Sequence, residues 1–368
     1  MATAETASRP ALERRLPISQ IVLWAVGVVL AALIGYWLIK NAIDSPDRFL
    51  EVTLIGVTNG SIYALVALGY TLVYGIIELI NFAHGDNFML GTFQTNGIVN
   101  NGSFQIPFFP TSFVLAIPLG AAATAHSSGA QKAYTIFMCL VFSMLFCMVI
   151  NVSIERIGYK PLRNKPRLAP LITALGFSFI LQNIGLAWKK PGPIPVPNIL
   201  PKGNVFATHG ITYAWKDFIV VLITVPLLIV LTWLVRSTKQ GKAMRATAQD
   251  RDASAMMGIN VDRTISFTFA LAGALAGAAG VVYALNIGTT NFQLGFRLGL
   301  FAFTAAVLGG IGNLSGAVLG GILLGLIAAY NDGFGDARWT TTIIFSILIL
   351  ILVFRPSGLL GEQTPEGQ

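Results

Sequence analysis

The stretch that decides the fold is Leu50–Ile80, LEVTLIGVTNGSIYALVALGYTLVYGIIELI, followed by Asn81-Phe82-Ala83-His84-Gly85-Asp86. The first part is longer than one upright membrane helix needs, since about 20 apolar residues at 1.5 Å each cross the hydrocarbon core. The Asn59-Gly60-Ser61 within it predicts a tilt, a kink or a break. The ionisable groups that follow are costly at membrane depth, so they indicate a cavity or a bundle interior.

The rest of the chain has the same character. Of its 368 residues, 54% are hydrophobic and 11% are charged, whereas a soluble domain carries about 25% charged residues. We therefore predict an all-α, polytopic transmembrane helix bundle of about ten spans, some of them broken or re-entrant. The other predicted helical segments are Ile18–Ile39, 84–105 (short or re-entrant), Ile106–Ala125, Ala133–Ser153, Leu168–Trp188, Asp217–Val235, Thr264–Leu285, 298–311, 314–330 and Thr340–Phe354.

Charge sets the predicted orientation. The net charge is +8, and basic residues gather in the short loops 155–167 and 236–263. The positive-inside rule places such loops in the cytoplasm, so the charge reflects topology and does not indicate nucleic-acid binding. We expect a cytoplasmic tail at 1–17, a transmembrane domain at 18–355 with its core at 50–355, and a cytoplasmic tail at 356–368. The proline-rich loop 189–216 is then external.

Residue patterns for catalysis or metal binding are missing. The histidines number three, at positions 84, 126 and 209, and none has the spacing of a metal-ligand pair. No G-x-x-x-x-G-K-[ST] phosphate loop is found. We therefore expect no catalytic residue, metal or cofactor in this chain. If ATP drives transport, it is bound with Mg²⁺ and hydrolysed by another polypeptide.

Five polar residues are candidates for a substrate pathway or gate. They are Asn81, His84, Asp86, Asn87 and Arg297. Other readings stay open: Asp86 could cap the next helix, and His84 could donate to a carbonyl exposed at a helix break. Arg297 could extend to the membrane interface, or it could line the pathway and bind a carboxylate in bidentate fashion.

Two further patterns concern packing and the loop 236–263. Gly312, Gly316 and Gly320 are four residues apart, a spacing that lets helices approach closely, either for fixed packing or for sliding. In the loop, Ala243–Met257 is a helix-forming stretch that Gly258 ends. We expect this helix to lie on the membrane surface or to dock on a partner.

Ordered motifs run through most of the chain, from about residue 50 to 361. They are Gly60-Ser61-Ile62-Tyr63-Ala64-Leu65, Gly69-Tyr70-Thr71-Leu72-Val73-Tyr74-Gly75-Ile76-Ile77, Asn81-Phe82-Ala83-His84-Gly85, Ser153-Ile154-Glu155-Arg156, Pro161-Leu162-Arg163, Leu181-Gln182-Asn183, Gly241-Lys242-Ala243-Met244-Arg245-Ala246, Gly258-Ile259-Asn260, Phe303-Thr304-Ala305-Ala306-Val307-Leu308-Gly309-Gly310-Ile311-Gly312 and Arg355-Pro356-Ser357-Gly358-Leu359-Leu360-Gly361. With these motifs the chain resembles the permease subunit of branched-chain amino acid ABC importers.

The resemblance implies a multi-pass protein of the bacterial inner (plasma) membrane that moves branched-chain or other neutral amino acids inward by alternating access. It implies a complex with two ABC ATPase subunits, a second homologous permease and an external substrate-binding protein, in contact with membrane lipid. It also implies that Arg245–Ile259 forms a coupling loop whose short helix enters a groove on the ATPase. The positions that match the coupling pattern are Arg245, Ala246, Ala248, Asp250, Gly258 and Ile259.

Three departures from the family pattern bear on the substrate and topology. The segment 18–39 extends beyond the usual shorter form, and 92–131 fits poorly. Phe301 stands where the family often has Lys, with Arg297 one helical turn earlier. Urea or short amides are therefore an alternative substrate class, and a stand-alone secondary carrier or channel is an alternative without a coupling helix.

Overall fold

A computed structural model describes residues 29, 32–33, 35–107, 127–163, 165–166, 168–206, 211–355 and 357–361. The chain divides into two units, 1–50 and 51–368. In the first unit, 35–44 are helical, and most of the predicted span 18–39 lies outside the described residues. All features discussed below belong to the second unit.

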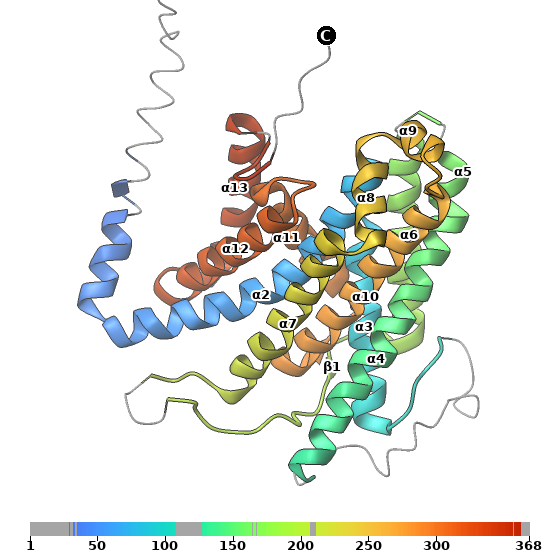
Figure 1. Cartoon of the computed structure of the whole chain (residues 1–368). Coiled ribbons are helices and arrows are strands. Elements are labelled where there is room, and N and C mark those ends of the chain that lie inside the picture. The colour runs from blue at the N-terminus through green and yellow to red at the C-terminus, as the bar shows by residue number, and fades with distance from the viewer. Residues whose placement is uncertain are drawn as a thin grey trace, which may run out of the picture. The chain divides into compact units, whose positions relative to one another are not determined.

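Helices make up nearly all of the described chain (Figure 1). The α-helices are α2 (Pro46–Ile77), α3 (Ala83–Asn101), α4 (Gly129–Ile154), α5 (Lys160–Leu162), α6 (Leu168–Lys189), α7 (Trp215–Ser237), α8 (Lys239–Gln249), α9 (Arg251–Met256), α10 (Val261–Ile287), α11 (Leu294–Gly309), α12 (Leu314–Phe334) and α13 (Thr340–Phe354). A π-helix, η2 (Glu155–Tyr159), joins α4 to α5, and a 3₁₀ turn, η3 (Ala337–Trp339), precedes α13.

Seven helices among the described residues are long and apolar enough to cross a membrane, and α11 is a shorter apolar helix. The predicted class, an all-α polytopic membrane protein, is confirmed. The number ten stays a prediction, since most of 106–125 also lies outside the described residues. The spanning helices α6, α7 and α13 bury few of their apolar side chains within this chain, so lipid or another subunit covers the remainder.

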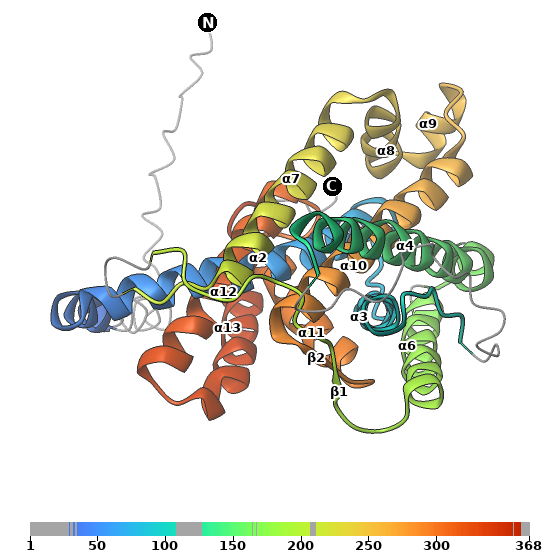
Figure 2. The same ribbon diagram turned by 90° about the horizontal axis from the view of Figure 1, so that it is seen from below.

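The helix α3 occupies the centre of the bundle. Every residue from Ala83 to Val99 is buried, and the helix packs against α4, α6, α10 and α11 (Figure 2). The segment 84–105, expected to be short or re-entrant, therefore forms a regular core helix. Its polar side chains face neighbouring helices, and several of them form hydrogen bonds there that lipid could not supply. For this reason its low hydropathy does not mark a surface element.

The long helix α2 runs unbroken through Asn59-Gly60-Ser61, so the break considered there does not occur. Gly60 instead permits a close helix crossing, because a Cβ atom at this position would lie 2.7 Å from the Cα of Ile322 on α12. Gly60 in this apolar run therefore marks a close contact between the backbones of α2 and α12.

The glycines of the predicted packing stripe have two different roles. Cβ atoms at Gly316 and Gly320 would overlap the carbonyl groups of Gly309 and Ala305 on α11, so both lie at a helix contact. Gly312 does not, which corrects its grouping with them. It lies in the turn between α11 and α12 with φ 94°, and no atom is within 4 Å of its Cβ position. Its backbone conformation is what favours glycine.

The two ends of the bundle carry different loops. Figure 1 shows α5, α8 and α9, which belong to the two basic loops, at one end and β1 at the other. The strand β1 (Ile194–Pro195) pairs antiparallel with β2 (Thr289–Thr290) and holds the loop 189–206 against the connection between α10 and α11. The basic loops and the proline-rich loop are thus segregated, as the charge pattern predicts.

Candidate functional site

The predicted pathway residues around the start of α3 are all buried. The Asn81 Nδ2 donates to Asn151 Oδ1 at 3.3 Å, and the Tyr159 hydroxyl donates to Asn81 Oδ1 at 3.2 Å. Asn151 Nδ2 in turn donates to the carbonyl of Phe269 on α10 at 2.6 Å. Asn81 therefore belongs to a hydrogen-bonded joint between α3, α4, η2 and α10.

Asp86 does not cap α3, which corrects that reading. The N-cap is Phe82, and no side chain bonds the free backbone donors there. Asp86 instead faces α6, where Ser178 Oγ donates to its Oδ2 at 2.5 Å and Gln182 Nε2 does so at 3.4 Å. Asn87 faces α4, since its Nδ2 donates to the Cys147 carbonyl at 3.0 Å.

His84 points toward α2. Its ring fills the space left by Gly69, where a Cβ would overlap Nε2, and it meets the Tyr70 ring at 4.8 Å between centroids. Neither ring nitrogen has a hydrogen-bond partner among the described residues. His84, Asp86 and Asn87 thus diverge toward three different helices. The structure does not bring them together, and their role in a pathway stays a prediction.

Arg297 lies in a different place, on a cavity of about 190 Å³. Four helices contribute to its wall: α2, α10, α11 and α13. The lining residues are Asn59, Ile62, Tyr63, Tyr283, Ile287, Arg297, Leu298, Phe301 and Thr341. This volume is below the roughly 300–1,000 Å³ of pockets for drug-sized ligands, so it suits a small molecule or one end of a larger one.

The electrostatics of this cavity are positive. Arg297 is exposed, stands in the first turn of α11 and lines the cavity. Its guanidinium is within hydrogen-bonding reach of the Tyr283 hydroxyl. Among the described residues, no carboxylate forms an ion pair with it. Sequence reasoning missed Asn59, Tyr63 and Tyr283, although polar residues four apart on α2 were a readable signal.

The residues predicted to couple to an ATPase lie at the other end of the bundle. The stretch Ala243–Met257, predicted to be one helix, is two helices that break at Asp250. Asp250 Oδ1 accepts from the backbone N–H groups of Asp252 and Ala253, each at 2.9 Å, so it starts a second helix instead of continuing the first. Arg245, Ala246 and Ala248 all lie on α8.

The tip of this loop exposes apolar surface. Met256 and Met257 end α9 and are each 82% exposed. Gly258 follows with φ 83° and turns the chain through Ile259 to Asn260, whose side chain caps α10. Arg251, at the start of α9, donates to the Ile76 carbonyl at the end of α2 at 2.9 Å. The tip is therefore joined directly to both α10 and α2.

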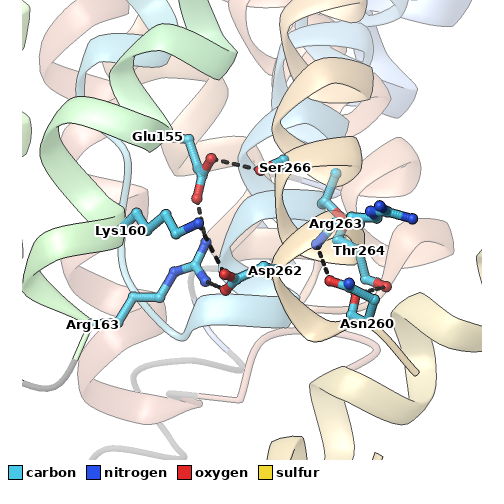
Figure 3. A network of polar contacts seen from close by, with 9 residues as sticks. Glu155, Lys160, Arg163, Asn260, Asp262, Arg263, Thr264 and Ser266 are labelled. Carbon is cyan, nitrogen blue, oxygen red and sulfur yellow. Dashed lines mark hydrogen bonds and ion pairs between the residues drawn. The ribbon is translucent and has the colours of Figure 1, made fainter. Parts of the chain in front are cut away.

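A charged network fixes the base of the same loop (Figure 3). Glu155 is fully buried, pairs with Arg163, and accepts from Ser266 Oγ at 2.7 Å. Arg163 Nη1 also meets Asp262 Oδ1 at 2.5 Å, and Lys160 Nζ meets Asp262 Oδ2 at 2.9 Å. The network ties η2 and α5 to the first turns of α10. Glu155 and Arg163 stand in the sequence motifs, but the sequence did not indicate that they contact each other.

Known proteins are similar to this chain in sequence. A family model described as "Branched-chain amino acid transport system / permease component" matches residues 52–353. The chain is 36% identical to the high-affinity branched-chain amino acid transport system permease protein BraD of Pseudomonas aeruginosa, over 87% of this chain and 98% of that protein. It is 34% identical to the permease LivH of Escherichia coli K12, over 86% of this chain and 97% of that protein. No solved structure shows significant similarity.

Proposed function

The chain belongs to the family of branched-chain amino acid transport system permease components, and on that premise we propose that it is the membrane-spanning subunit of an ABC importer for branched-chain or other neutral amino acids. Its relatives are named as permeases of high-affinity branched-chain amino acid transport systems. A permease component of a transport system works with other components. We propose that these are two ABC ATPase subunits, a second homologous permease and an external binding protein.

The observation that carries this proposal is the apolar tip of α9. Two methionines, each 82% exposed, stand at the end of the molecule where the basic loops gather, next to a glycine turn. Large apolar side chains in such a place mark a surface that another protein covers, and methionine adapts well to a partner's groove. We propose that an ATPase binds there on the cytoplasmic side.

The connections of this tip support alternating access as the mechanism. The helix α9 leads through Gly258 into α10, and Arg251 joins it to the end of α2. Residues of α10 and α2 that lie farther from the tip also line the Arg297 cavity. A displacement of α9 by an ATPase is therefore carried along packed helices to the cavity, which is the coupling that an importer needs.

The experiment replaces both tip residues, as Met256→Asp with Met257→Asp, in the tagged full chain. We expect at least a tenfold loss of co-purified ATPase and of ATP-dependent leucine uptake in proteoliposomes, because two charges oppose burial of the tip. The matched control is Phe206→Asp, an exposed apolar residue in the proline-rich loop. Monodisperse elution of both variants shows that the membrane fold persists.

Gly258→Val provides a second variant that acts through the backbone alone. No atom lies within 4 Å of its Cβ position, so only the positive φ is disfavoured, at about 1–2 kcal/mol. We expect the turn to shift and uptake to fall while the bundle stays folded. Normal ATPase binding and normal uptake in both variants would refute the proposed coupling surface. Uptake by the wild-type chain without any ATPase would favour a stand-alone carrier.

A further inference from the structure

The lining of the Arg297 cavity contains both polar and apolar side chains. On α2, Asn59 and Tyr63 are one helical turn apart; on α10, Tyr283 is one turn before Ile287; on α11, Arg297 is one turn before Phe301. The polar groups are a guanidinium, two phenol hydroxyls, an amide and the hydroxyl of Thr341. The apolar side chains are those of Ile62, Ile287, Leu298 and Phe301. Such a cavity suits a small ligand with one anionic end and one hydrocarbon end.

The charge of Arg297 lacks an internal partner. Among the described residues no carboxylate pairs with it, and the neutral hydroxyl of Tyr283 interacts with it. A guanidinium presents paired N–H donors that match a carboxylate in bidentate geometry.

A negative group lies close to the same cavity. The Tyr63 hydroxyl is within electrostatic range of both Arg297 and Asp332 of α12. Asp332 accepts a hydrogen bond from Thr340 at the start of α13, and the next residue, Thr341, lines the cavity. The surroundings of Tyr63 therefore include a positive and a negative charge, and a zwitterion carries the complementary pair.

We propose that this cavity is a binding site for a zwitterionic amino acid, with Arg297 as the donor to its α-carboxylate and the side chains of Ile62, Ile287, Leu298 and Phe301 as the surface for its hydrocarbon side chain. This inference rests on the proposed function and deepens it. It assigns recognition of the carboxylate to the permease itself.

The competing explanation is that Arg297 merely extends to the membrane interface. In that case any cation serves equally well, because a point charge at the interface needs no fork geometry. The two explanations differ in what Arg297→Lys does and in whether the ligand must carry a carboxylate. A decisive experiment therefore varies both the side chain and the ligand.

The experiment measures binding of radiolabelled leucine to the permease complex purified through a tag on this chain, without the external binding protein. Unlabelled leucine competes in the wild type, and we expect leucinamide, which lacks the carboxylate, to compete at least tenfold more weakly. Loss of a charged hydrogen-bond donor weakens binding by about 10- to 100-fold, so Arg297→Gln should show a loss of that size. Arg297→Lys should recover part of it.

The matched control is Arg338→Gln, which removes an exposed arginine that pairs with Asp336 just before α13. It should bind leucine as the wild type does. Monodisperse elution and normal ATPase content of Arg297→Gln establish that the complex is intact. Uptake into proteoliposomes with the binding protein present should show the defect of Arg297→Gln as a raised KM with a smaller change in kcat.

The outcomes separate this inference from the proposed function. If the wild type transports leucine but Arg297→Gln binds it equally well, or leucinamide competes as well as leucine, the carboxylate site is refuted and the importer stands. If Arg297→Lys equals the wild type in binding, the interfacial explanation holds. If the intact wild-type complex transports urea or short amides and no amino acid, the proposed substrate class fails.

Discussion

Arg163 and Arg297 differ in the groups that surround them. Arg163 is 14% exposed and pairs with two carboxylates, those of the buried Glu155 and of Asp262. Arg297 is exposed on a cavity, and among the described residues no acid pairs with it. An arginine that is satisfied inside the chain holds elements together. One that is left with hydroxyls and an open cavity is available to a ligand.

One helix, α10, carries a neighbour of each arginine. Asp262, the partner of Arg163, stands in the first turn of α10, and Tyr283, the neighbour of Arg297, stands near its end. Between them Gly273 and Gly277 bring α10 against α4, and Gly280 brings it against α3. These contacts leave no room for a Cβ, so α10 is held along its length. A rigid helix with a clamp at one end and a ligand site at the other is well placed to couple them.

The largest expected effect concerns the clamp. Glu155→Ala removes the buried carboxylate and leaves Arg163 with only the more exposed Asp262. Breaking one partner of a buried ion pair costs about 3–5 kcal/mol, and we expect about 3 kcal/mol because Arg163 is partly exposed. The thermal unfolding midpoint of the purified chain should fall by several degrees. An unchanged midpoint would show that the network contributes nothing to the fold.

A smaller loss is expected for Arg163→Gln. The change leaves the buried Glu155 carboxylate without a cation, but Ser266 still donates to it and the new amide can donate as well. We therefore expect a loss of about 2–3 kcal/mol, just below that of Glu155→Ala. The comparison with Arg297→Gln is the sharper readout. Arg163→Gln should lower the unfolding midpoint, whereas Arg297→Gln should lower leucine binding at an unchanged midpoint. The reverse pattern would overturn the distinction drawn between the two arginines.

The sequence predicted the class of fold well because hydropathy and basic loops follow directly from the membrane. It was less informative about α3, since a polar helix inside a bundle has the composition of a surface element. Asp86 illustrates the difficulty: a carboxylate three residues into a helix suggests a cap, yet Ser178 and Gln182 on another helix bind it. Contacts between helices distant in sequence are not visible in local patterns.

The candidate cavity was predictable in one residue only. Arg297 could be identified as a charge in an apolar stretch. The four-residue spacing of Asn59 and Tyr63 was a signal within α2, but no local pattern places them beside Tyr283 of α10 or beside Arg297. The role of the loop 236–263 in coupling stays a prediction from its motif, and its break into α8 and α9 depended on the cap at Asp250. A capping aspartate between two short helical stretches was the available signal.

A moderate loss of leucine binding is expected from Tyr283→Phe, which tests the proposed role of Arg297. The change keeps the ring and removes the hydroxyl near the guanidinium. Loss of one hydrogen bond of about 1 kcal/mol corresponds to roughly fivefold weaker leucine binding. In the double variant with Arg297→Gln the losses should be less than additive, because both residues would act on one carboxylate. Strict additivity would indicate that the two residues serve separate purposes.

The smallest expected effect concerns an arginine pair of a third kind, Arg338 with Asp336. The two are 2.8 Å apart and both are exposed. The hydrogen bond from Arg338 lowers the pKa of Asp336, so any stabilisation would be present above the carboxyl's ordinary pKa and lost as the pH falls through the lowered one. Solvent and salt screen such a pair. Asp336→Asn should therefore leave the unfolding midpoint unchanged at neutral pH and should not alter its decline in acid. A measurable loss would mean that exposure is a poor guide to which arginines matter, and the contrast between Arg163 and Arg297 would then have to rest on their carboxylate partners alone.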